Sequence, residues 1–147
     1  MTTSNSAETA ILNLIFANQN WANIGNNGGL RGSTVDGHFY ISLHTADPGE
    51  AGSQNTSEAT YTSYSRVQID RTSAAWTISG NSATNVNPIT FPISTGGGTN
   101  IITHFGIGTD STGVGNLLFS GALSLPLTVV SGVGPNFIAS ALTVTSD

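Results

Sequence analysis

Three histidines are the residues best suited to acid–base or metal chemistry in this sequence. They are His38, His44 and His104, and they show neither the i, i+4 spacing of a helical metalloprotease pair nor a His-x-His pattern. His44 and His104 each lie on the polar side of a segment with alternating polarity. If these segments are neighbouring strands, the two imidazoles approach each other and Asp36 or Asp47 can join them. The alternative interpretation is a pair of hydrogen-bonded histidines on a half-buried β surface, and we expect no metal site.

Serine is abundant, but the sequence lacks the context that nucleophilic catalysis requires. No Gly-x-Ser-x-Gly elbow is present, and the absence of cysteine removes thiol catalysis, disulfides and zinc–thiolate sites. A Ser-His-Asp triad is recognised by geometry, so a hydrolase that uses His44 or His104 is a minor alternative. Asp70 lies beside Arg71 and near Arg66, which favours a surface ion pair over a paired-carboxylate site. We therefore expect no catalytic residues and no enzymatic activity.

Two glycine-rich segments resemble phosphate-binding loops only superficially. Residues 106–115 lack the Gly-x-Gly-x-x-Gly spacing because Ser111 interrupts it, and no helical pattern follows. Asp110–Gly113 is typical of a hairpin turn, and Gly96–Gly98 is typical of a loop tip. The sequence predicts no nucleotide site and no other cofactor.

Composition and charge exclude several classes of partner. The 147 residues carry a net charge of −5, and only 7% of them are charged, where about 25% is usual. The only cations are Arg31, Arg66 and Arg71, which are too few and too scattered to neutralise a row of phosphates. No apolar run approaches the ~18 residues of a membrane span, so we expect neither a nucleic-acid partner nor a membrane partner. A polar surface without lysine favours association with copies of itself, as a homo-oligomer such as a trimer, or with another protein.

One helix is predicted among the elements that position these residues. Apolar residues recur with helical spacing from Ala7 to Ile15, and Glu8 lies in the first turn, where the helix dipole favours a carboxylate. Ser6 is the predicted N-cap, and the helix is predicted to run to about Asn20. The glycine-rich residues 25–29 end this segment because they accept positive φ.

After Gly37 the apolar period changes from 3.6 to 2, which indicates strands. The predicted strands are 39–44, 65–71, 75–79, 88–92, 101–107, 117–123, 127–130 and 137–144. Many short strands at a spacing of about 8–12 residues favour an all-β domain, an antiparallel sandwich or jelly-roll-like fold with one N-terminal helix. We expect one domain over residues 1–147, with the helix and its turn at about 6–24 and the β domain at about 37–145.

The segment from Asp47 to Tyr64 is the longest one without apolar periodicity, and long loops of this kind are often functional. We predict that it contacts a partner together with the N-terminal helix. Tyrosine and arginine are enriched at interface hot spots, and ordinary sheet packing is the alternative role for those in this segment. The predicted partner-binding residues are Asp47, Glu50, Glu58, Tyr61, Tyr64 and Arg66.

Several ordered segments resemble a family of small tailed-bacteriophage virion proteins. Residues 43–52, LHTADPGEAG, are similar to the LHTADPG-x-AG segment of that family. The other segments follow in the same order: WANI at 21–24, YTSYSR at 61–66, ITFP at 89–92, ITHFGI at 102–107 and GNLLFSGAL at 115–123. The resemblance covers about residues 7–145. Members are described as tail-fibre-like or uncharacterised, and related small β proteins are capsid decoration or cement proteins.

The resemblance implies a structural virion component without enzymatic activity, made in the host cytoplasm. Our first hypothesis is a decoration protein on the capsid exterior that binds the major capsid protein at subunit junctions and stabilises the head by mass action. A tail, baseplate or tail-fibre-associated protein is the alternative, followed by a glycan- or receptor-binding module. The sequence contains neither a heptad stalk nor a repetitive β shaft, which favours decoration over a fibre.

Overall fold

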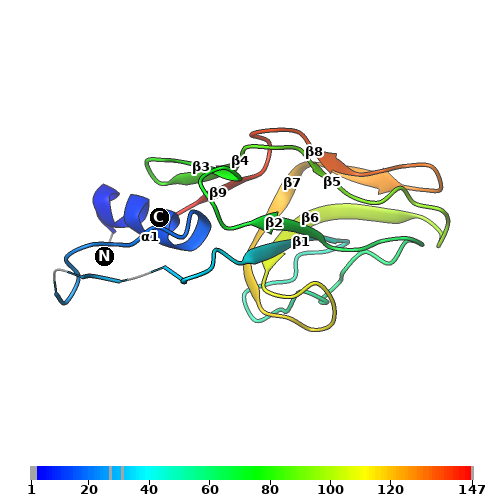
Figure 1. Ribbon diagram of the computed structural model, residues 1–147. Helices are drawn as coiled ribbons and strands as arrows, with labels where there is room; N and C mark the ends of the chain where they lie inside the picture. Colours follow the sequence, from blue (N-terminus) through cyan, green and yellow to red (C-terminus); the bar gives the residue numbers. More distant parts are fainter. Residues whose placement is uncertain (1–2, 27, 31, 147) are drawn as a thin grey trace. The chain divides into compact units, whose positions relative to one another are not determined.

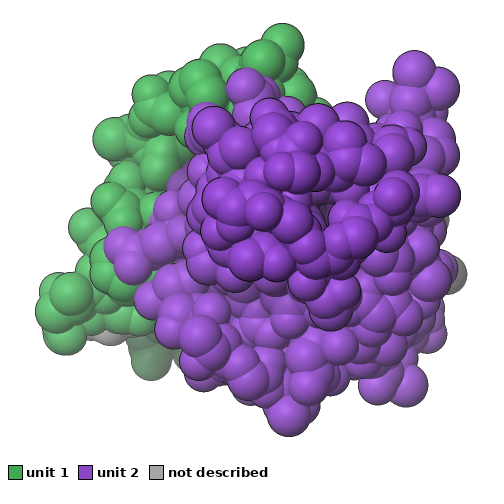
Figure 2. Space-filling view, turned by 90° about the vertical axis from the view of Figure 1, so that its right-hand side faces the viewer, with its two compact units in different colours: residues 1–38, 70–88, 137–147 green, residues 39–69, 89–136 purple. Residues whose placement is uncertain are grey.

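The computed structural model describes residues 3–26, 28–30 and 32–146 (Figure 1). Arg31, one of the three cations, lies outside the described residues. The chain divides into two compact units, the first made of residues 1–38, 70–88 and 137–147 and the second of residues 39–69 and 89–136 (Figure 2). That these units form one domain stays a prediction. Within the described ranges, no helix has the length and apolarity needed to cross a membrane.

The first unit contains the N-terminal helix α1, Asn5–Phe16. Its buried face includes Leu12 and Phe16, and the rings of Phe16 and Trp76 pack with their centroids 4.6 Å apart. The helix is shorter than predicted because Asn18 adopts a left-handed φ of 54°, and the Asn18 amide donates to the Ser33 carbonyl. The predicted cap is also wrong: Ser4 occupies the N-cap, without a side-chain cap hydrogen bond.

A three-stranded antiparallel sheet in the same unit has the order β3-β4-β9. The strands are β3 (Trp76–Ser79), β4 (Ser82–Asn85) and β9 (Thr143–Thr145), and α1 packs on β3 and β4. β4 is absent from the predicted strands because Ala83 is its only apolar residue, so it shows no apolar alternation. The predicted strand 137–144 is instead two strands, β8 (Asn136–Phe137) and β9, because Ser140 interrupts it with a φ of 61°.

The second unit is built on a four-stranded sheet with the order β2-β1-β6-β7. The strands are β2 (Val67–Asp70), β1 (His38–His44), β6 (Asn100–Gly108) and β7 (Leu117–Val129). β6 is antiparallel to both β1 and β7, and the short strand β5 (Ile89–Thr90) pairs with β8. The prediction of a mostly β protein with antiparallel sheets and one N-terminal helix is confirmed.

β7 is one long strand rather than the two predicted ones, and it is irregular at two places. Its register against β6 shifts between Ile107 and Gly108 and again between Ile102 and His104. At the second shift β7 carries extra residues that include Leu125, which is 78% exposed. On the β6 side of this shift, Ile101 is exposed and Ile102 is buried. A bulge inserts residues into one strand and breaks the alternation that the sequence pattern assumes.

Candidate functional site

Arg66 and Glu58, two of the predicted partner-binding residues, form a shielded ion pair. The Arg66 guanidinium donates from Nε to Glu58 Oε1 at 2.7 Å and from Nη2 to Oε2 at 2.8 Å. Side-chain exposure is 2% for Arg66 and 16% for Glu58. The hydrogen bond to Glu58 raises the pKa of Arg66 above its usual range, so this arginine is charged at all working pH values.

The same guanidinium fixes the hairpin between β6 and β7. Arg66 Nη1 donates to the Asp110 carbonyl at 2.8 Å, and Nη2 donates to the Gly113 carbonyl at 2.6 Å. With Glu58 these bonds occupy the guanidinium fork, and bidentate pairing of this kind adds geometric specificity. The ion pair therefore connects the 47–64 segment to the 109–116 turn within the second unit.

Tyr64 and Tyr61, also predicted to bind a partner, serve the interior of this unit. The Tyr64 hydroxyl donates to Glu58 Oε1 at 2.9 Å and accepts from the Leu43 N–H at 3.0 Å. Burial raises the pKa of Tyr64 above its usual range, and it does the same for Tyr61. Tyr61 is only 2% exposed, and its hydroxyl donates to the Pro92 carbonyl at 3.1 Å. These contacts fit the alternative role of sheet packing, and binding of a partner by the same residues stays a prediction.

The two histidines that the sequence analysis singled out are neighbours in the sheet. His44 of β1 and His104 of β6 are register partners, so the strands are neighbours and their register places the two residues opposite each other. His44 is fully buried: its Nδ1 lies 2.8 Å from the Thr56 carbonyl and its Nε2 lies 2.8 Å from Ser42 Oγ. Because a carbonyl can only accept, Nδ1 carries the proton and Nε2 accepts from Ser42. Burial lowers the pKa of His44, which favours the neutral imidazole.

This Ser42–His44 pair has the hydrogen bonding of a nucleophile and a base, but it is sealed. Both residues have no exposed surface. Gly106 lies directly over the pair, since a Cβ at this position would lie 2.6 Å from both His44 Nε2 and Ser42 Oγ. A nucleophile must reach its substrate, so the geometry of His44 fits a hydrogen-bonded structural histidine better than the hydrolase alternative.

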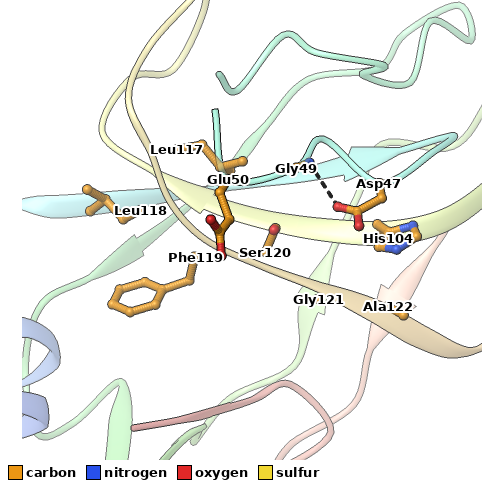
Figure 3. Close-up of a pocket in the computed structure, with 10 residues that line it drawn as sticks. All are labelled: Asp47, Gly49, Glu50, His104, Leu117, Leu118, Phe119, Ser120, Gly121 and Ala122. Atoms are coloured by element: carbon orange, nitrogen blue, oxygen red, sulfur yellow. Dashed lines mark hydrogen bonds between the residues drawn. The ribbon is translucent and has the colours of Figure 1, made fainter. Parts of the chain in front are cut away.

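Asp47 and Glu50 are the two predicted partner-binding residues that face solvent. Both are exposed and lie on the turn after β1, where Asp47 Oδ1 accepts from the Gly49 N–H at 2.9 Å. They line a pocket of about 640 Å³ whose wall is β7 and to which β6 contributes His104 (Figure 3). The further lining residues are Gly49 and the run Leu117–Ala122.

The 47–64 segment is not an open arm in this structure but a covering of β1. Its backbone returns antiparallel to β1: Ala59 N–H donates to the Leu43 carbonyl and Thr45 N–H to the Ser57 carbonyl, both at 2.8 Å. Gln54, which the sequence analysis did not single out, is fully buried, and its Oε1 accepts from the Asp110 N–H at 2.9 Å. The sequence pattern does not predict burial of a polar loop residue, because its burial depends only on which groups surround it in the folded structure.

The β7 residues that line the pocket were not among the predicted site residues. Ser120 and Ala122 are exposed residues of this strand, and His104 is the register partner of Ala122. The described residues contain no group of three or more His, Cys, Asp or Glu side chains able to hold a metal ion. The pocket combines two carboxylates and the imidazole of His104 with an uncharged strand.

Comparison with known proteins identifies one family. The family model described as "Podophage GP4 fiber I protein gp80" matches residues 2–145. None of the curated proteins matches this chain. The match spans both compact units and all the segments discussed above.

Proposed function

Because this chain belongs to the podophage GP4 fiber I protein gp80 family, it is a structural fibre protein of a phage virion and not an enzyme, and we propose that it is a component of the tail fibres. The family match over residues 2–145 is the observation that carries this proposal. It favours the tail-associated hypothesis over capsid decoration, which the sequence analysis had placed first.

A network of side-chain hydrogen bonds supports a role in mechanical stability. Arg66, Glu58 and Tyr64 connect a long surface segment to the β6–β7 hairpin by charge-assisted hydrogen bonds. Such bonds are about twice as strong as neutral ones. A covering fixed at several points resists local opening, which suits a protein that transmits force or holds position in a particle.

We further propose that the protein acts by binding other virion proteins and in several copies. The lack of lysine and the low charge support association with itself, since lysine is depleted at interface cores. A trimer is one such assembly, and the major capsid protein is the partner that the capsid hypothesis requires.

The copy number of this chain in purified particles tests the location. Quantitative mass spectrometry would measure it relative to the major capsid protein, and gold-labelled antibody would place it by electron microscopy. We expect a ratio of a few per cent and label on the fibres. A ratio near one, or a simple fraction such as one third, would support the capsid-decoration hypothesis instead. Absence of the chain from the particle would overturn the proposal that it is a structural virion protein.

A further inference from the structure

We propose that the edge of β7 between Phe119 and Ala122 binds a short extended segment of another virion protein that carries arginine or lysine. This inference rests on the proposed function, because it assumes that contacts with other proteins hold the chain in the particle. It assigns a surface and a chemical class of partner to that function.

The position of β7 in the sheet supplies the backbone of this site. β7 ends the strand order β2-β1-β6-β7, so within the described sheet no strand lies on its outer side. Edge strands present N–H and C=O groups that can pair with an added strand. Successive residues of a strand point to opposite faces, yet all six residues from Leu117 to Ala122 line the pocket. The pocket therefore runs along the edge of β7 and not only across one face.

Irregularities at both ends limit the length of this edge. The register against β6 shifts at Leu117–Phe119, and beyond Ala122 the strand carries extra residues before it pairs again at Leu127. Pro126, which has no N–H to donate, lies in this second irregularity. Bulges and proline protect edges against unlimited edge-to-edge association. The remaining edge accommodates a short segment and disfavours pairing of long strands.

Charge identifies the occupant. Asp47 and Glu50 line the pocket, and the strand beside them is uncharged from Leu117 to Val129 (Figure 3). A second copy of β7 would supply no cation and would bring a second pair of carboxylates with it. A segment with arginine or lysine neutralises the pair, and complementary charge promotes both binding and selection of the partner.

The alternation of the strand also predicts the pattern of the partner. Ser120 and Ala122 lie on the same face as His104, because register partners share a face. An added strand would place its cationic side chains on this face, toward Asp47 and Glu50. Side chains on its other face would meet Phe119 and Gly121, where small or apolar residues fit. The expected segment therefore alternates basic with small or apolar residues.

A titration with synthetic peptides tests this inference on the full-length protein. The probe is a short peptide of alternating threonine and valine with two arginines on one face, and its matched control carries two glutamates instead. Nuclear magnetic resonance of isotope-labelled protein would follow the amide signals of β7. We expect the arginine peptide to shift the signals of Phe119–Ala122, to bind more weakly as salt rises, and to bind more tightly than the glutamate peptide. N-methylation of the peptide backbone should abolish binding.

Two variants that each remove one carboxylate charge complete the test. Glu50→Gln should weaken the arginine peptide about threefold, the effect of one exposed charge pair. Asp70→Asn removes the same charge outside the pocket, where Asp70 pairs with His38, and should leave binding unchanged. Thermal melts would verify that both variants are folded.

Three results would overturn the inference. They are no shift of the β7 signals with the arginine peptide, equal binding by the Glu50→Gln variant, and concentration-dependent shifts of the same signals without peptide, which would identify a second copy as the occupant. The copy number tests the proposed function separately. If the protein is found on the fibres but does not bind the peptide, this inference is wrong and the proposed function stands.

Discussion

Arg66 binds both carboxylate oxygens of Glu58, from Nε at 2.7 Å and from Nη2 at 2.8 Å. The same guanidinium also bonds the carbonyls of Asp110 and Gly113. One side chain therefore fixes the segment that covers β1 to the hairpin that connects β6 with β7.

Removal of this arginine should destabilise the protein strongly. Arg66→Ala leaves the Glu58 carboxylate shielded and without its counter-charge, and loss of one partner of a buried pair costs about 3–5 kcal/mol. Urea unfolding followed by circular dichroism measures the loss. Hydrogen exchange should show faster exchange at residues 110–116, since two of their carbonyls lose a donor.

Matched variants distinguish the contribution of charge from that of bidentate geometry to the stability of the Arg66–Glu58 pair. Arg66→Lys keeps the charge but cannot bind both oxygens in a fork, so its loss should be smaller than that of Arg66→Ala. The double variant Glu58→Gln with Arg66→Met removes both charges and should recover part of the stability. If Arg66→Ala were as stable as the native protein, the pair would contribute no more than an exposed one.

Acid should destabilise the protein through His44. Burial lowers the pKa of this imidazole below its usual 6.5, against the opposing effects of the Thr56 hydrogen bond and the Glu58 charge. Below pH 6.5 the unfolded chain therefore binds a proton that the folded chain does not, so the free energy of unfolding falls as pH falls. The loss stops once the pH is below the lowered pKa. The free energy of unfolding should therefore be lower at pH 5.5 than at pH 7.5.

Two variants attribute this pH dependence to the correct histidine. In His44→Gln the amide cannot titrate, so the stability difference between the two pH values should shrink. His38→Gln changes a histidine whose side chain is 46% exposed and should keep the native difference. An unchanged pH profile in His44→Gln would assign the effect to other groups.

Gly106 should not tolerate a methyl group. A Cβ there would lie 2.6 Å from His44 Nε2 and Ser42 Oγ and 2.7 Å from a methyl carbon of Leu117. Overpacking of this kind costs about 1–3 kcal/mol. Gly134→Ala is the control, because its nearest neighbour is a side-chain carbon of Ile93 at 3.0 Å that can move. Thermal melts should show a larger loss for Gly106→Ala than for the control.

Arg71 should stabilise the end of α1. Its Nε donates to the Ile15 carbonyl at 2.8 Å and its Nη2 donates to the Leu14 carbonyl at 3.1 Å. The last carbonyls of a helix have no partner within the helix, and a cation there also favours the helix dipole. Arg71→Gln should cost about 1–2 kcal/mol and speed hydrogen exchange in α1. Equal exchange in the variant and the native protein would contradict this role.

The sequence by itself determined the fold class and most strands of this protein. Alternation from Phe39 to His44 depends only on neighbouring residues and the period of a strand, so it predicted β1 directly. The same alternation placed His44 and His104 on polar sides, and the pairing and register of β1 and β6 bring them opposite each other. Local patterns failed where the structure departs from regular periods: at Asn18, which ends α1, and at the register shifts of β7.

Only the tertiary structure decided what the candidate residues do. Glu58, Tyr64 and Arg66 have the composition of an interface, and in the structure their polar groups bond one another and the 110–113 turn. Asp47 and Glu50 come from the same segment and remain exposed beside β7. Whether a side chain of this segment is buried or exposed depends on its partners distant in the sequence. The local hydrophobic period contains no information about those partners. Burial of a charge is possible only where such partners exist, because an unpaired charge costs too much to remove from water.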